Sequence, residues 1–245
     1  MIDDIFRRAT TRRAPPMNGE GMDSLRRILR AAWFPYVAPF AVFALFTYGG
    51  GQWPGAAHLW YLAKTVVVGT TLWAFRHRYP ELGWSRRPGN WAIATVVGVV
   101  VLVVWVTPEK ALAPLMMGDP SGFDPYAFGF GTGLTGGVIA VRILGASVVV
   151  PVMEELFWRS FLMRYLIDAD FQRVSLGAFS TLSFVAVATA FGFEHHRWVV
   201  GIFAGIAYGG LLVWRRDLFT CILAHGVTNL GLGLYVLKTG QWHFW

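Results

Sequence analysis

The sequence has few charged residues for its length. Asp, Glu, Lys and Arg make up 14% of its 245 residues, whereas a soluble domain carries about 25%. Hydrophobic residues make up 55%, and the mean hydropathy is +0.48. This composition excludes an ordinary water-soluble domain and indicates an integral membrane protein.

Cysteine is almost absent as well. The single cysteine, Cys221, lies within a hydrophobic segment. One cysteine excludes an intrachain disulfide bond, and we expect this thiol to be buried and inert.

Several catalytic signatures are also missing. The sequence has no His-Glu-x-x-His motif, no Gly-x-Ser-x-Gly motif, and no paired aspartates in its last four hydrophobic segments. These absences argue against a zincin-type metal site, a serine nucleophile on a strand-to-helix turn, and a pair of catalytic aspartates.

Basic residues outnumber acidic ones, which gives a net charge of +7 and a pI of about 9.9. In a soluble protein this excess would indicate nucleic-acid binding. Here the arginines cluster between hydrophobic runs, where they determine membrane topology instead. We therefore expect the lipid bilayer as a partner, and no nucleic acid.

Seven hydrophobic windows meet or approach the length of about 20 residues that a membrane-spanning helix needs. We therefore predict an all-α fold, a polytopic transmembrane helical bundle of about seven spans. A further stretch, residues 111–130, is rich in Gly, Pro and aromatic residues. It is a candidate partial insertion, which would raise the count to eight. The windows cover residues 31–49, 57–75, 91–107, 137–163, 176–194, 198–214 and 218–237.

Arginines in the short loops predict the orientation in the membrane. They precede the first window and follow the second, fourth and sixth windows. This alternation predicts a multi-pass protein of the inner (plasma) membrane with a cytoplasmic N-terminus. One conflict remains, because His195 would then lie on the outer side, far from the inner helix ends. A re-entrant or broken fifth segment would remove it.

No internal repeat or low-complexity linker divides the chain. We expect residues 1–30, with seven Arg and four acidic residues, to form a cytosolic basic tail or an interfacial segment. Residues 31–136 would hold the N-terminal transmembrane helices and a loop. Residues 137–245 would form a helical core that carries ionisable residues within apolar segments, where such residues are functional-site candidates.

The first ionisable motif is Glu154-Glu155-x-x-x-Arg159. Glu155 and Arg159 are four residues apart and share a helical face, whereas Glu154 points about 100° away. We expect Arg159 to neutralise Glu155, and Glu154 to face a cavity where it suits a general base. The alternative is a buried ion pair that only holds helices together.

Two further motifs contain histidines, one at the end of a predicted helix and one on the face of another. Phe191 and His195 share one helical face, and His225 and Asn229 share another. A histidine transfers protons or binds a metal, and His225 with Asn229 also suits an oxyanion. The alternatives are a solvated helix end at His195 and interhelical hydrogen bonding at the second pair.

Other features inside the hydrophobic windows have simpler explanations. Gly201, Gly205 and Gly209 form a stripe that favours close helix packing. Lys64 is expected to extend toward the membrane surface, and Arg142 is a candidate partner for an acidic residue or a substrate carboxylate.

Taken in order, Glu-Glu-x-x-x-Arg, Phe-x-x-x-His and His-x-x-x-Asn resemble the signature of the CAAX protease and bacteriocin-processing family. The resemblance covers about residues 137–235 and would make residues 137–245 a CAAX-protease-like catalytic core. The stretches 157–166 and 240–245 are similar to a bacterial subgroup associated with exosortase systems.

The resemblance implies peptide-bond hydrolysis within the bilayer. Glu154 and His195 would activate a water molecule, and His225 and Asn229 would stabilise the oxyanion, with Glu155 and Arg159 in support. No cofactor is expected. The alternative is a zinc-dependent version in which Glu154, His195 and His225 bind the metal.

We therefore predict an intramembrane endopeptidase that cleaves near the C-terminus of a membrane-associated or lipidated protein or peptide. One alternative is a non-catalytic membrane immunity or binding protein of the same fold. Another is a proton-coupled transporter that uses Glu154 and His195 as a relay, although the repeated halves typical of transporters are not visible.

Overall fold

The computed structural model describes residues 19–85, 87–112, 115 and 122–245. Within these ranges all regular structure is helical and no strand is present, so the predicted all-α fold is confirmed. The chain divides into two compact units, residues 1–34 and 35–245. In the first unit, α2 (Gly19–Arg30) covers the end of the expected basic tail, and residues 1–18 lie outside the described residues.

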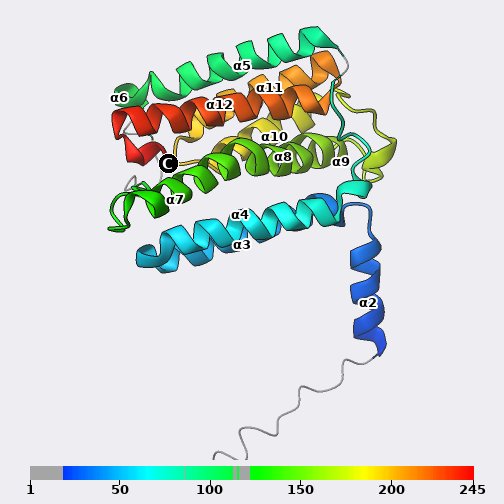
Figure 1. Ribbon diagram of the computed structural model, residues 1–245. Coiled ribbons are helices and arrows are strands. Elements are labelled where there is room, and N and C mark those ends of the chain that lie inside the picture. The colour runs from blue at the N-terminus through cyan, green and yellow to red at the C-terminus, as the bar shows by residue number, and fades with distance from the viewer. Residues whose placement is uncertain (1–18, 86, 113–114, 116–121) are drawn as a thin grey trace, which may run out of the picture. The chain divides into compact units, whose positions relative to one another are not determined.

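Each of the seven hydrophobic windows forms a helix (Figure 1). In chain order these are α3 (Phe34–Gln52), α4 (Ala57–Ala74), α5 (Pro88–Val106), a continuous helix over Thr132–Tyr165, α10 (Thr181–Phe193), α11 (Trp198–Arg215) and α12 (Leu218–Thr239). The shorter elements are η1 (Pro54–Ala56), η2 (Arg76–Arg78), α6 (Glu109–Leu112), η6 (Phe171–Arg173) and η7 (Trp242–Phe244).

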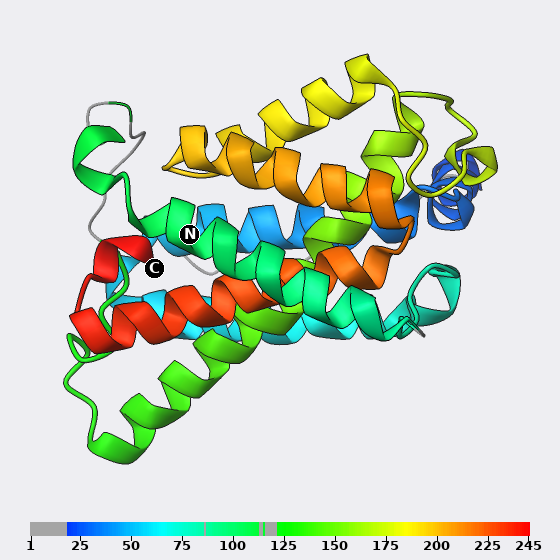
Figure 2. The same ribbon diagram turned by 90° about the horizontal axis from the view of Figure 1, so that it is seen from above.

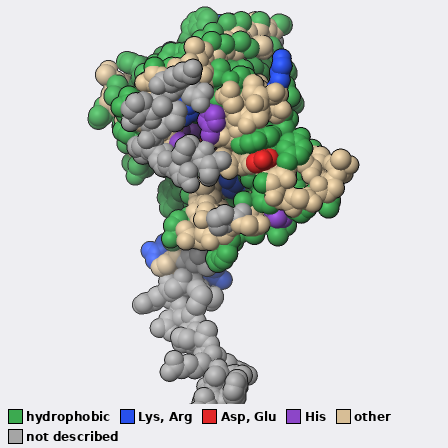
Figure 3. Space-filling model, turned by 90° about the vertical axis from the view of Figure 1, so that its left-hand side faces the viewer, with side chains coloured by type: hydrophobic (Ala, Val, Ile, Leu, Met, Phe, Trp, Pro, Cys, Tyr) green, Lys and Arg blue, Asp and Glu red, His purple; other side chains and the backbone are tan. Residues whose placement is uncertain are grey.

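Four of the described helices are long and apolar enough to cross a membrane: α5, the Thr132–Tyr165 helix, α11 and α12. Figure 3 shows a surface that is largely hydrophobic, with only scattered charged side chains. The protein is therefore a membrane protein with a helical-bundle fold. The exact number of spans stays a prediction, and residues 113–114 and 116–121 of the candidate partial insertion lie outside the described residues.

The fifth window forms a helix that is short rather than broken. α10 is apolar but has only 13 residues, which cover about 20 Å at the usual rise. The hydrocarbon core is about 30 Å thick. A residue that follows α10 therefore need not reach the opposite membrane surface, and this removes the conflict over His195.

The Thr132–Tyr165 helix contains two π-helical stretches. It runs as α7 (Thr132–Leu144), η4 (Gly145–Val149), α8 (Val150–Glu154), η5 (Glu155–Leu162) and α9 (Met163–Tyr165), and both η4 and η5 are π-helical. π-helical turns inside α-helices occur frequently at functional sites. The second glutamate and the arginine of the first motif lie in η5.

The helix α12 is central to the second unit. It packs against α5, α11, η4, α8 and η5, and the view in Figure 2 shows α12 beside α5 and α10 beside α11. Contact with α5 is close at Gly98, where a Cβ atom would lie 2.5 Å from the carbonyl oxygen of Ala224. The helix α12 also approaches the long helix closely, because a Cβ atom at Gly226 would lie 2.7 Å from the carbonyl oxygen of Ser147.

The predicted glycine stripe packs α11 against α10. A Cβ atom at Gly201 would lie 2.9 Å from the Cα of Gly192, and one at Gly205 would lie 2.8 Å from the carbonyl oxygen of Ala188. A larger residue at either position would push the two helices apart. The structural interpretation of the stripe is confirmed.

Candidate active site

The acidic pair lies where α8 meets η5, inside the second unit. Glu154 is 3% exposed, and Glu155 and Arg159 are fully buried. Arg159 Nε lies 3.2 Å from Glu155 Oε2, as their spacing predicts. The Arg159 guanidinium also lies over the ring of Phe191, 4.2 Å from its centre, so the pair is enclosed by protein on both sides.

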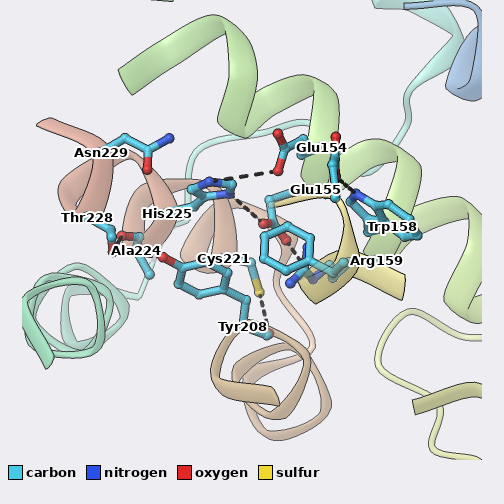
Figure 4. A network of polar contacts seen from close by, with 12 residues as sticks. Glu154, Glu155, Trp158, Arg159, Tyr208, Cys221, Ala224, His225, Thr228 and Asn229 are labelled. Carbon is cyan, nitrogen blue, oxygen red and sulfur yellow. Dashed lines mark hydrogen bonds and ion pairs between the residues drawn. The ribbon is translucent and has the colours of Figure 1, made fainter. Parts of the chain in front are cut away.

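The imidazole of His225 connects α12 to this acidic pair (Figure 4). Its Nδ1 donates a hydrogen bond to Glu155 Oε1 at 2.9 Å, and its Nε2 lies 3.9 Å from Glu154 Oε2. The ring of Tyr208 stacks on the imidazole with centres 5.0 Å apart. Glu155 and Tyr208 therefore fix the ring so that Nε2 is the nitrogen that faces Glu154.

His195 follows α10 by two residues and is held by its own helix end. Its Nδ1 lies 2.8 Å from the carbonyl oxygen of Phe191. A carbonyl only accepts hydrogen bonds, so Nδ1 carries the proton and Nε2 of the neutral ring is the acceptor. The ring packs edge-on to Trp105, with centres 5.3 Å apart. The helix end thus selects the tautomer that a general base requires.

Asn229 lies one turn beyond His225 and binds the long helix. Its Nδ2 donates to the carbonyl oxygen of Ala146 at 2.8 Å. Pro151 occupies the position five residues after Ala146, where a π-helical N–H partner would lie, and proline has no N–H. Asn229 supplies that missing donor and keeps one amide N–H for another acceptor.

These elements enclose one cavity of about 190 Å³, which Glu154, His195, His225 and Asn229 all line. Glu154 Oε2 is buried and has no hydrogen-bond partner among the described residues. Glu155 and Arg159 do not line the cavity, because they lie behind His225. The remaining lining residues are Trp105, Arg142, Ala146, Val150, Phe191, Ala204, Tyr208, Thr228, Leu232, Phe244 and Trp245.

Sequence reasoning missed two contributors to this site. Tyr208 stacks on His225 and donates from its hydroxyl group to Thr228 Oγ1 at 2.7 Å. Trp158 Nε1 donates to Glu194 Oε2 at 3.1 Å, which ties η5 to the residue before His195. A signal existed for Tyr208, because it is the only residue of α11 with a side-chain hydroxyl group.

The alternative zinc set does not form a metal-binding cluster. Among the described residues, no three His, Cys, Asp or Glu side chains converge as ligands. We therefore derive no step through a metal.

A comparison with protein families identifies the segment that contains this site. The family model described as Type II CAAX prenyl endopeptidase Rce1-like matches residues 136–231, about two fifths of the chain, and this segment contains all three motifs. No curated protein and no solved structure matches the chain, and the exosortase-associated subgroup stays a hypothesis. Residues 136–231 of this membrane protein are therefore similar to the Rce1-like family of type II CAAX prenyl endopeptidases.

Proposed function

We propose that the protein is an intramembrane endopeptidase that hydrolyses a peptide bond near the C-terminus of a membrane-associated or lipidated protein or peptide. The observation that carries the proposal is the single cavity lined by Glu154, His195, His225 and Asn229. The family match over residues 136–231 supports the same reaction class.

In this proposal Glu154 and His195 activate the water molecule. Glu154 accepts a proton as the water oxygen adds to the peptide carbonyl carbon. Its Oε2 is available for this step because it has no hydrogen-bond partner among the described residues. His195 accepts the second hydrogen bond of the water through Nε2 and so orients the water for attack.

His225 and Asn229 stabilise the oxyanion that forms on the carbonyl oxygen. The Nδ1–H of His225 is held by Glu155, so Nε2 is the ring nitrogen that faces the oxyanion and donates to it when it carries a proton. Asn229 donates the amide N–H that Ala146 does not use. The C–N bond then breaks, and Glu154 passes its proton to the leaving amine. The products are a carboxylic acid and an amine.

We also propose that the N-terminus and the loops that follow α4, α9 and α11 face the cytoplasm. Arg87, from the loop after α4, lines one surface depression together with Arg215 and Arg216, from the loop after α11. This proximity supports placing both loops on one side of the membrane. Labelling of single cysteines in these loops, in sealed vesicles of known orientation, tests the assignment.

The experiment that tests the function uses purified protein in lipid nanodiscs with membrane-anchored peptide substrates. We expect hydrolysis by the wild type that persists in chelator, and none by Glu154→Gln. Failure of the wild type to cleave any substrate would favour the immunity or binding protein, and proton flux without cleavage would favour the transporter. Activity that chelator abolishes and zinc restores would favour the zinc-dependent version.

A further inference from the structure

A half-buried cation, Arg142, lines the cavity that contains Glu154 and His225. Arg142 lies on α7, and its Nε is buried with no hydrogen-bond partner among the described residues. Within that part of the chain, none of the ion pairs includes Arg142. A guanidinium inside a membrane bundle normally pairs with an acid. This one faces the cavity without such a partner.

The surroundings of Arg142 hold its charge in place but do not neutralise it. Its guanidinium lies 4.5 Å from the ring centre of Tyr61, 4.4 Å from that of Phe123 and 5.0 Å from that of Trp245. The hydroxyl group of Tyr61 also donates to the backbone oxygen of Arg142 at 3.2 Å. Aromatic faces attract a cation, but they supply no hydrogen-bond acceptor in its plane. The N–H groups therefore remain available to an anion.

A second positive charge lies near the same tyrosine. Lys64 Nζ is 5.0 Å from the ring centre of Tyr61 and donates to Thr47 Oγ1 at 3.1 Å. Lys64 lines a different depression from the one that contains Glu154 and His225. Arg142 is therefore the cation inside the cavity, and Lys64 is a matched cation outside it.

Arg142 and Glu154 lie on one continuous helix, twelve residues apart, and both line the same cavity. The carboxyl terminus of a bound peptide at Arg142 would therefore place a peptide bond a few residues upstream beside Glu154.

We propose that Arg142 forms an anion subsite that binds the C-terminal carboxylate of the substrate and so fixes the distance from that terminus to the scissile bond. A guanidinium matches a carboxylate through two parallel hydrogen bonds. The inference rests on the proposed endopeptidase activity, because it assigns a substrate end to the same cavity.

The test compares two membrane-anchored peptides that differ only at their last group, one ending in a free carboxylate and the other in a carboxamide. For the wild type in nanodiscs we expect kcat/KM to be about 10- to 100-fold higher for the carboxylate peptide, the range of a charge-assisted hydrogen bond. In Arg142→Gln this ratio should fall to about one. Lys64→Gln, which removes the same charge outside the cavity, should keep the wild-type ratio.

A binding measurement separates failure of the subsite from failure of the proposed activity. The carboxylate and carboxamide peptides are titrated against Glu154→Gln and against Glu154→Gln combined with Arg142→Gln. Tighter binding of the carboxylate that requires Arg142 upholds the subsite even if the wild type cleaves nothing, in which case the proposed activity alone fails.

Two results would overturn the subsite. One is cleavage by the wild type with equal kcat/KM for both peptides. The other is a loss of function in Arg142→Gln that is the same for both peptides and depends on anionic lipid in the nanodisc, because the anion would then be a lipid headgroup. The mass of the released product checks the length, and release of a short C-terminal fragment of one constant length is the expected result.

Discussion

Two buried ion pairs lie along the same helix, and they differ in how completely their polar atoms are bonded. At the first, Arg159 pairs with Glu155 beside His225, and Glu154 Oε2 next to it has no hydrogen-bond partner among the described residues. At the second, Arg164 pairs with Glu81 at 3.1 Å. The first cluster adjoins the cavity, and the second lies near the end of the long helix.

The second cluster, which consists of Glu81, Ser160, Arg164 and Tyr36, is fully bonded. Glu81 Oε1 accepts from Ser160 and Arg164, and Glu81 Oε2 accepts from the Tyr36 hydroxyl group at 3.1 Å. A buried polar network in which every group is satisfied makes a structure rigid. A buried carboxylate that lacks a partner and faces a cavity requires another explanation. The difference agrees with the proposed catalytic role of the first cluster and with a stabilising role of the second.

The largest expected effect is the loss of turnover in Glu154→Gln. An amide cannot accept the proton of the attacking water, so turnover should fall by about 10⁴-fold or more, near the limit of detection. The melting temperature should stay close to that of the wild type, because the amide has nearly the same size. Turnover is measured on purified protein in nanodiscs, and full activity of this variant would contradict the role of Glu154.

The next effect is on stability, in Arg159→Ala. Removing Arg159 leaves Glu155 buried without its cation, which costs about 3–5 kcal/mol in comparable pairs. The free energy of unfolding in detergent should fall by that amount, far more than in Glu154→Gln. Arg159→Lys retains the charge and serves as the control. Equal stability of the alanine variant and Glu154→Gln would show that the pair does not hold the helices.

A smaller effect is expected for Asn229→Ala, which should lower both turnover and stability. Loss of one oxyanion donor lowers turnover by about 10²–10³-fold. Loss of its bond to Ala146 O leaves that carbonyl without its side-chain donor, which costs about 1–3 kcal/mol of stability. Substrate binding to the variant should persist. If turnover per folded molecule equals that of the wild type, Asn229 only completes the hydrogen bonding of the π-helical turn.

Much of the fold was predictable from the sequence, because each hydrophobic window forms a helix, although α10 is shorter than its window and the long helix extends beyond its own. That the site residues lie close together was predictable only from the order of the three motifs along the sequence. Spacing placed Glu155 and Arg159 on one face, and their ion pair follows from that spacing. It did not predict that η5 is π-helical or that Glu155 would bond to His225, because both depend on the packing of α12 against the long helix.

The aromatic part of the cavity was not predictable. Trp105, Phe244 and Trp245 come from regions that are far apart in the sequence, and hydrophobic patterns do not distinguish an aromatic residue at a cavity from one at a membrane interface. Arg142 was identifiable as an unusual residue inside an apolar window, but its position in the cavity with Glu154 depends on the tertiary structure.

The smallest expected effect concerns the second cluster, in Glu81→Gln. The amide oxygen can accept from Ser160 or from Tyr36 but not from both, since the two hydroxyl groups donate to different oxygens of Glu81. Arg164 also loses its counter-ion, so stability should fall by about 1–3 kcal/mol. Turnover per folded molecule should equal that of the wild type, because Glu81 does not line the cavity. The same chemical change in two buried glutamates therefore separates the two clusters, since Glu154→Gln removes turnover and Glu81→Gln removes stability. Thermal unfolding and turnover measured on one preparation of each variant check this. If Glu81→Gln lost turnover without losing stability, the assignment of the second cluster to stability would be wrong.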